Sequence, residues 1–188
     1  MPPSSPTDKA PIRPPHPLAL RLIERLRPRL PGRVRVLDFA AGSGRNTAAL
    51  ADAGFDVVAI DDATAAAMPI AGLHGQFAGM VSTHGFLHGS AADVARRIDA
   101  VARHLSPEAP IAVTFGSPSD TRVRAGTRID ESTYAPQSGE ERGVAHAFFT
   151  ESQLLALLAP AFDVESVEER GADGKAESVH WFVLARRR

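Results

Sequence analysis

The residues best suited to chemistry lie in and around a turn of small residues near the start of the chain. Asp38 ends the apolar run 34–37 and is followed by Ala40, Gly42 and Gly44. Small residues in a turn let the backbone approach a ligand, and the helix that follows directs its free amide groups to the same place. The pattern predicts a ligand-binding corner with a carboxylate at its edge.

A second acid completes this corner. Asp61 ends the next apolar run, 55–60, which is expected to be a buried strand, and it lies 23 positions after Asp38 (61 − 38). An acid about 20 residues after such a turn, at the tip of the second strand, is placed to accept hydrogen bonds from ribose hydroxyls. Residues 34–61 therefore predict a strand–turn–helix–strand unit that binds a nucleoside.

Two cofactors compete for this corner. A dinucleotide such as NAD favours Gly-x-Gly-x-x-Gly/Ala, but counting from Gly42 the third small position holds Thr47. Asp38 would also repel a pyrophosphate, whereas an acid suits a cofactor with a cationic amino-acid end. The two residues favour S-adenosylmethionine and disfavour a nicotinamide-dependent oxidoreductase.

The run VLDFAAGSGRN…GFDVVAID resembles motif I and the following strand of class I S-adenosylmethionine-dependent methyltransferases. VSTHGFLHG (81–89), TFGSPSDTR (114–122) and ERGVAHAFFTESQLLALL (141–158) are similar, in the same order, to one bacterial subgroup of small-molecule-type methyltransferases. The resemblance covers residues 33–185. It implies methyl transfer from S-adenosylmethionine to an unidentified, small-molecule acceptor. It also implies an α/β, Rossmann-like fold with a mostly parallel sheet that ends in an antiparallel hairpin.

The corner and the resemblance together suggest roles for individual residues. Asp38 is expected to hydrogen-bond the methionyl ammonium group, Asp61 the ribose, and Ser82 to line the methyl-transfer site. Ala40 stands where a glycine is usual but is still small. The alternative for Asp38 is an acid that braces its own loop. The expected cofactor-binding residues are Asp38, Ala40, Gly42, Gly44, Asp61 and Ser82.

Histidines are the candidates for a catalytic base. His84 ends an expected strand, together with Ser82 and Thr83, and His146 follows the long, mostly polar segment 116–145, the expected acceptor-binding lid. For both, a hydrogen-bonded structural histidine is the alternative. Arg122 is expected either to bind an anionic acceptor or to pair with Asp120. The seven histidines show no spacing of a zinc site, so no metal is expected.

One segment departs from the methyltransferase pattern. Residues 62–76 number only 15, and a βαβ crossover alone needs a dozen or more. The sequence therefore predicts that an edge strand is missing and that the adenine is partly exposed. The alternative function is a degenerate methyltransferase-like protein with weak or no cofactor binding, acting as a binding or scaffold protein.

Composition indicates the number of domains and the classes of partner. The 188 residues are 44% apolar, carry a net charge of −1 and contain no cysteine. One domain over 18–188 is expected behind a flexible, Pro-rich tail over 1–17. The charge favours neither nucleic acid nor a membrane as a partner. A cytoplasmic location is the default, and a homodimer could complete an open adenine pocket.

Periodicity and capping patterns place the other elements. Helices are expected over 18–27 and 90–105, and a third after the capping-box spacing of Thr150 and Gln153. The remaining expected strands are 111–115 and a hairpin of 162–169 with 179–185.

Overall fold

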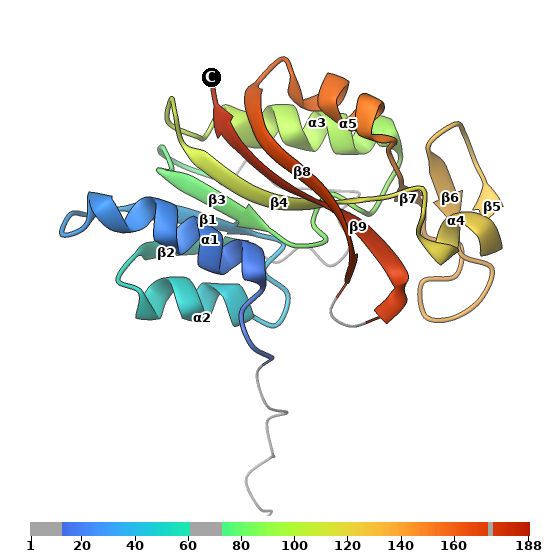
Figure 1. Cartoon of the computed structure of the whole chain (residues 1–188), viewed down its shortest axis with the longest axis horizontal. Coiled ribbons are helices and arrows are strands. Elements are labelled where there is room, and N and C mark those ends of the chain that lie inside the picture. The colour runs from blue at the N-terminus through green and yellow to red at the C-terminus, as the bar shows by residue number, and fades with distance from the viewer. Residues whose placement is uncertain (1–12, 61–72, 173–174) are drawn as a thin grey trace, which may run out of the picture.

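A computed structural model of the chain describes residues 13–60, 73–172 and 175–188. Its centre is a six-stranded sheet in the order β2-β1-β3-β4-β9-β8 (Figure 1). The first four strands are parallel, and β9 runs antiparallel to both of its neighbours. The strands are β1 (Arg35–Phe39), β2 (Asp56–Ile60), β3 (Gly79–Ser82), β4 (Pro110–Gly116), β8 (Phe162–Ala172) and β9 (Lys175–Arg187). The mostly parallel α/β sheet with a C-terminal hairpin is confirmed.

The apolar runs form strands because the sheet buries them. β4 is buried along its whole length and β1 along all but its first residue, as parallel strands covered on both faces are. The expected strand 111–115 is confirmed and is one residue longer at each end. β2 is only partly buried, which differs from the expected buried strand. It lies at the edge of the sheet that the described residues form, so one of its sides lacks a covering neighbour.

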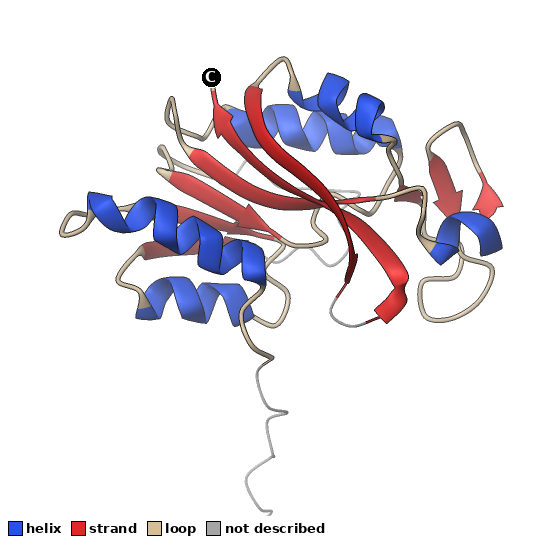
Figure 2. Cartoon of the chain, in the orientation of Figure 1, coloured by secondary structure: helices blue, strands red, loops and turns tan. Residues whose placement is uncertain are grey.

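Helices cover both faces of the sheet (Figures 1 and 2). α1 (Pro17–Leu26) and α2 (Arg45–Asp52) lie on one face, and α3 (Ala91–Ala102) and α5 (Glu151–Leu158) lie on the other. Leu18, Leu22 and Leu26 of α1 are all buried, as their i, i+4 spacing predicts. A short 3₁₀ helix, Arg27–Arg29, follows α1, so the expected helix ends at the residue before Arg27.

Both capping boxes are formed in full. Thr150 caps α5 by accepting from the backbone of Gln153, whose side chain accepts from the backbone of Thr150. Ser90 and Asp93 make the same reciprocal pair at α3. Since the first amides of a helix have no partners within it, these pairs fix where each helix begins.

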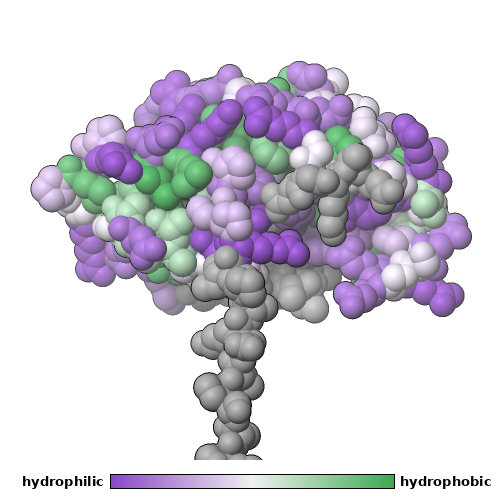
Figure 3. Space-filling model, turned by 60° about the horizontal axis from the view of Figure 1, so that its bottom comes forward, coloured by the Kyte–Doolittle hydropathy of each residue, from purple (hydrophilic) through white to green (hydrophobic). Residues whose placement is uncertain are grey.

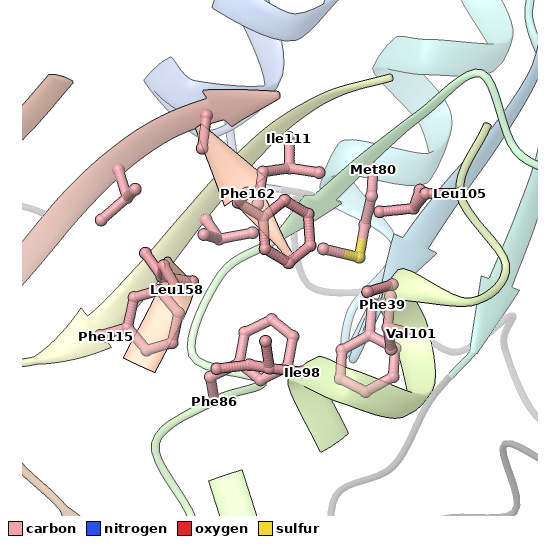
Figure 4. Packing of buried hydrophobic residues seen from close by; sticks show 14 of the residues in the cluster. Phe39, Met80, Phe86, Ile98, Val101, Leu105, Ile111, Phe115, Leu158 and Phe162 are labelled. Atoms are coloured by element: carbon pink, nitrogen blue, oxygen red, sulfur yellow. The ribbon is translucent and has the colours of Figure 1, made fainter. Parts of the chain in front are cut away.

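The larger core lies under α3 and α5 (Figure 4). The rings of Phe39, Phe86 and Phe115 stack in a row, with centroid separations of 5.1 and 5.4 Å. Phe39 ends β1 and Phe115 lies near the end of β4. This row therefore fixes the carboxyl ends of two strands relative to the segment after β3.

The expected lid is more ordered than its polar sequence indicates. It contains α4 (Thr121–Ala125) and most of a separate three-stranded sheet of β5 (Thr127–Arg128), β6 (Thr133–Ala135) and β7 (His146–Ala147). We refer to residues 117–149 as the lid segment. Figure 1 shows the lid segment beside the carboxyl end of β4. Strands of two or three residues are too short to show a period of two, which is why the sequence pattern missed them.

The C-terminal hairpin is confirmed, and both strands are longer than expected. On the face in Figure 3, hydrophilic residues predominate, and apolar residues gather on the side where α1 and α2 lie. Leu20 of α1 is 46% exposed. Within the described ranges, no helix has both the length and the apolar character that a membrane span requires.

Three expectations concern segments outside the described residues. The tail expected over 1–17 is described only from Arg13, where His16 is buried and Pro17 begins α1. Asp61 and most of the shortened segment 62–76 also lie outside the described residues. The missing edge strand and the ribose role of Asp61 therefore stay predictions.

Candidate functional site

The turn after β1 has the backbone geometry of a close-approach loop. Ala40, Gly42 and Gly44 have φ values of 60, 52 and 76°, in the left-handed region that glycine tolerates and alanine rarely adopts. A Cβ atom added to Gly42 or Gly44 would meet nothing within 4 Å. The space beside both glycines is thus open to a ligand, and Gly44 is also the N-cap of α2.

Asp38 lies fully buried beneath this turn. Its Oδ2 accepts a hydrogen bond of 2.6 Å from the hydroxyl of Thr47, whereas its Oδ1 has no partner among the described residues. Burial raises the pKa of this carboxyl group, and the hydrogen bonds from Thr47 oppose the increase only in part. One oxygen braces the loop, and the other is left for a donor or a cation.

Asn46 is a site residue that the sequence analysis did not single out. Its buried side chain accepts from the backbone N–H of His16 at 3.0 Å and donates to the hydroxyl of Thr83 at 3.2 Å. It joins the start of α2 to the end of β3 and to the segment before α1. The only signal in the sequence is an amide side chain two residues after Gly44, the last residue of the glycine turn.

Ser82 lies at the end of β3 but does not face the open space. Its Oγ is buried and has no partner within the described part of the chain. A Cβ atom at Gly85 would lie 2.4 Å from that oxygen and 2.8 Å from the Cβ of Ala40. Ser82 is therefore packed under Gly85 and beside the turn. Its role in cofactor binding stays a prediction.

His84 pairs with a second histidine that the sequence analysis did not group with it. His84 has a φ of 71°, and its backbone N–H donates to the hydroxyl of Thr114 at 2.8 Å. Its ring meets that of His180 edge-on, with a centroid separation of 4.8 Å. His180 lies on β9 opposite Gly116. β9 is the last strand along the chain, but in the sheet it lies beside β4. The two rings therefore come together only in the folded protein.

His180 is held in its neutral form. Burial, assisted by the nearby His84 and Arg122, lowers its pKa to about 3. Its Nε2 lies 3.4 Å from Nη2 of Arg122, and its buried Nδ1 has no partner in the described ranges. A neutral ring beside a permanent cation can accept a hydrogen bond at little cost.

Arg122 pairs with Asp120, as one of the two expectations for it stated. The guanidinium donates to both carboxylate oxygens, with distances of 2.9 and 2.8 Å. Asp120 is fully buried and also accepts from the backbone N–H of Val179. Burial raises the pKa of Asp120, but the bonds from Arg122 and Val179 outweigh it and hold that pKa below its usual value. The pair fixes α4 to the hairpin.

His146 lies in a second histidine pair and not beside His84. Its ring is buried and lies 4.9 Å, between centroids, from that of His88. Burial lowers the pKa of His146, although the carbonyl of Val144 and the charge of Glu141 favour the proton. Arg122 connects the two pairs, because its Nη1 lies 3.8 Å from Oε2 of Glu141.

Comparison with solved structures identifies the fold. A methyltransferase from Methanosarcina mazei has a TM-score of 0.69 and 18% identity, over 93% of this chain and 98% of its own. The 1,6-didemethyltoxoflavin N1-methyltransferase of Burkholderia thailandensis, with bound S-adenosylhomocysteine, has a TM-score of 0.63 and 20% identity, over 91% and 78%. The fold is that of S-adenosylmethionine-dependent methyltransferases.

A third methyltransferase agrees with this. The magnesium protoporphyrin IX methyltransferase of Synechocystis, also with bound S-adenosylhomocysteine, has a TM-score of 0.60 and 14% identity, over 90% of this chain and 82% of its own. No protein-family model and no curated protein matches the sequence. At these identities the methyltransferase fold is shared, and the chemistry has to be argued from the residues of this chain.

Proposed function

We propose that the protein is an S-adenosylmethionine-dependent methyltransferase that acts on a small-molecule acceptor. The observation that carries the proposal is the Oδ1 of Asp38, which has no partner among the described residues and is buried beneath a turn whose glycines leave open space. A buried carboxylate oxygen without a donor is costly unless a ligand supplies one. The ammonium group of a methionyl cofactor is a donor of the right charge.

The residues present fit this cofactor. Asp38 would accept a hydrogen bond from the ammonium group of the cofactor, and Asp61 would accept hydrogen bonds from its ribose hydroxyls. The turn at Ala40, Gly42 and Gly44 would let the protein backbone approach the cofactor closely. When bound, S-adenosylmethionine supplies an electrophilic methyl group on a sulfonium, which an acceptor can take by in-line displacement.

The carboxyl ends of β3 and β4, where open α/β sheets bind their ligands, would hold the acceptor. A neutral oxygen or nitrogen acceptor must lose a proton during the transfer, so a nearby base helps. His84 is the proposed base, because it lies two residues after the end of β3 and its ring contacts the neutral ring of His180. The lid segment would exclude water and hold the acceptor at attack distance. His146 is the weaker candidate, since its buried ring already contacts Glu141 and Val144.

A small-molecule acceptor agrees with the balanced charge. A net charge of −1 provides no general attraction to nucleic acid or to anionic lipid. The structural neighbours from Burkholderia and Synechocystis are named for small organic acceptors. We propose a cytoplasmic enzyme without nucleic-acid or membrane partners, and sedimentation velocity would show whether it forms a homodimer.

Calorimetric titration of the purified protein with S-adenosylmethionine, S-adenosylhomocysteine and NAD tests the proposal. We expect both sulfur nucleosides to bind and NAD not to bind. Asp61→Ala should weaken binding by about tenfold or more, because one or two charge-assisted hydrogen bonds are lost. Asp62→Ala is the matched control, since it removes the adjacent acid.

The result also separates the two candidate functions. If neither sulfur nucleoside binds at millimolar concentration, the methyltransferase proposal is wrong, and the degenerate binding or scaffold protein becomes the better explanation. Equal losses in the two alanine variants would instead remove Asp61 from the site.

A further inference from the structure

Three side chains with metal-ligating atoms meet at the boundary between the lid segment and the loop after β3. They are His88, Glu141 and His146, and one ligand atom of each lies within 4.8 Å of the others. Oε1 of Glu141 is 3.1 Å from Nε2 of His88, and Oε2 is 3.1 Å from Nε2 of His146. The carboxylate therefore lies between two imidazoles that the chain separates by 58 positions (146 − 88).

The backbone fixes this arrangement. His88 and His146 face each other in an antiparallel bridge, flanked by bonds from the N–H of Ala147 to the carbonyl of Leu87 and from the N–H of Gly89 to the carbonyl of Ala145. Directly opposed residues between such flanking bonds form the closer type of antiparallel pair, in which side chains lie nearest each other. The two histidines are thus preorganised and do not depend on a flexible loop to meet.

The tautomer of His146 leaves a lone pair inside the cluster. Nδ1 lies 2.8 Å from the carbonyl oxygen of Val144, which can only accept, so Nδ1 carries the hydrogen. In the neutral ring, Nε2 is then an acceptor that faces a second acceptor, Oε2 of Glu141, at 3.1 Å. Two acceptors at this distance need a cation between them. A metal ion bound by both atoms would supply that positive charge.

We propose that His88, Glu141 and His146 bind a divalent transition-metal ion of the Zn²⁺ type. Two imidazole nitrogens and one carboxylate oxygen are a known ligand set for zinc, and a histidine that ligates a metal commonly donates its other ring N–H to a carbonyl, as His146 does. A ligand set of two nitrogens and one carboxylate does not suit Mg²⁺ or Ca²⁺, because both ions prefer oxygen ligands.

The distances require little movement. Zinc lies about 2.0–2.2 Å from nitrogen and oxygen ligands, so neighbouring ligand atoms in a tetrahedral site are a little over 3 Å apart. The two 3.1 Å contacts, one from each oxygen of Glu141, are near this spacing, and one ligand atom from each of the three residues lies within 4.8 Å of the others. The side chains of Glu141 and His88 are 47% and 23% exposed, whereas that of His146 is fully buried. An ion can therefore enter from solvent, and two of the three ligands can adjust toward it.

The charges around the cluster permit a divalent cation. Arg122 lies 3.8 Å from Glu141, and its charge is balanced by the buried Asp120, which it contacts through two hydrogen bonds. Three protein ligands leave a fourth coordination position for water or for an oxygen of a bound molecule. An ion would also connect the lid segment to the loop after β3.

Metal binding to the full-length protein, with any polyhistidine tag removed and the metal stripped by a chelator, tests the proposal. Titration with Zn²⁺ should show one site by calorimetry, and Co²⁺ should give the visible absorption bands of a nitrogen- and oxygen-ligated ion. Glu141→Gln keeps the size of an exposed side chain but removes its charge, and it should weaken Zn²⁺ binding by about a hundredfold. Neither measurement depends on cofactor binding or methyl transfer.

Two control variants make the outcome decisive. Glu140→Gln changes the neighbouring exposed acid, and His74→Gln removes an exposed histidine outside the cluster; both should bind Zn²⁺ like the wild type. Thermal unfolding in metal-free buffer verifies that each variant folds. Wild-type binding no tighter than that of Glu141→Gln, or the absence of any cobalt bands, would overturn the proposal and leave a proton as the shared cation.

Discussion

Two residues show how a single side chain sets the position or the charge of its neighbours. Thr47, which weighs against a dinucleotide in the sequence, donates a hydrogen bond to Asp38 and so holds one carboxylate oxygen in place. His180 stays neutral between His84 and Arg122. Both residues contact the groups that they influence, so the effect of each can be tested by substituting it.

The neutrality of His180 predicts a pH dependence of stability. Its pKa is about 3 in the folded protein and 6.5 as the unperturbed value, so between these values the unfolded chain binds the extra proton. The wild-type free energy of unfolding should therefore decrease as the pH falls below 6.5. At full effect the loss is about 1.4 kcal/mol per pH unit.

Urea unfolding of the wild type and of His180→Gln at pH values from about 7 to about 4 measures this loss. We expect the variant to lose less stability than the wild type over this range. The carboxyl groups titrate in both proteins, so the difference between the two curves isolates the histidine. Parallel curves would mean that His180 is protonated or exposed in solution.

At the scale of elements, one helix cap both starts its helix and contacts another part of the chain. The capping box of Thr150 and Gln153 starts α5, and Nε2 of Gln153 also donates to Glu131 at 3.3 Å, in the lid segment. The cap thus connects a core helix with the lid. Its loss should affect both.

We expect Thr150→Ala to lower the free energy of unfolding by about 1 kcal/mol, since the first amides of α5 lose their acceptor. Ser152→Ala is the control, because Ser152 is exposed in the first turn of the same helix. Chemical denaturation of the three proteins measures the difference. An unchanged midpoint in Thr150→Ala would show that water replaces the cap at no cost.

Elements with a strong local pattern were predictable from the sequence, and contacts across the sheet were not. The glycine turn, the amphipathic helix starting near Leu18 and the cap at Thr150 each depend on neighbouring residues, and all three are confirmed. His180 and Glu141 reach their partners only because β9 inserts beside β4 and the lid segment folds back on the loop after β3. No local pattern encodes those two pairings.

At the scale of the molecule, a bound cofactor should stabilise the fold. The turn after β1, the segment before α1 and the end of β3 meet through Asn46, so a ligand held at this turn restrains three parts of the chain. At a concentration 100 times its dissociation constant, a ligand that binds only the folded state raises the free energy of unfolding by about 2.7 kcal/mol.

Trp181 provides the signal for this measurement. It is the only tryptophan of the chain, and its indole N–H donates to the carbonyl of Phe149 at 2.6 Å, between the hairpin and the lid segment. We expect S-adenosylhomocysteine to raise the urea concentration at the midpoint of unfolding, measured by the fluorescence of Trp181. In Asp61→Ala, a tenfold weaker ligand at the same concentration should add only about 1.4 kcal/mol, so its shift should be about half as large. An equal shift in both proteins would place the ligand elsewhere.

The position of β9 has a consequence for how the protein is made. β9 lies between β4 and β8, although β8 precedes it in the chain (Figure 1). A nascent chain that has emerged only as far as β8 cannot add that strand to the sheet, and the edge of β4 stays unpaired. Such an edge is a template for pairing with other chains. Each new molecule is therefore exposed to aggregation at this edge until β9 pairs with β4.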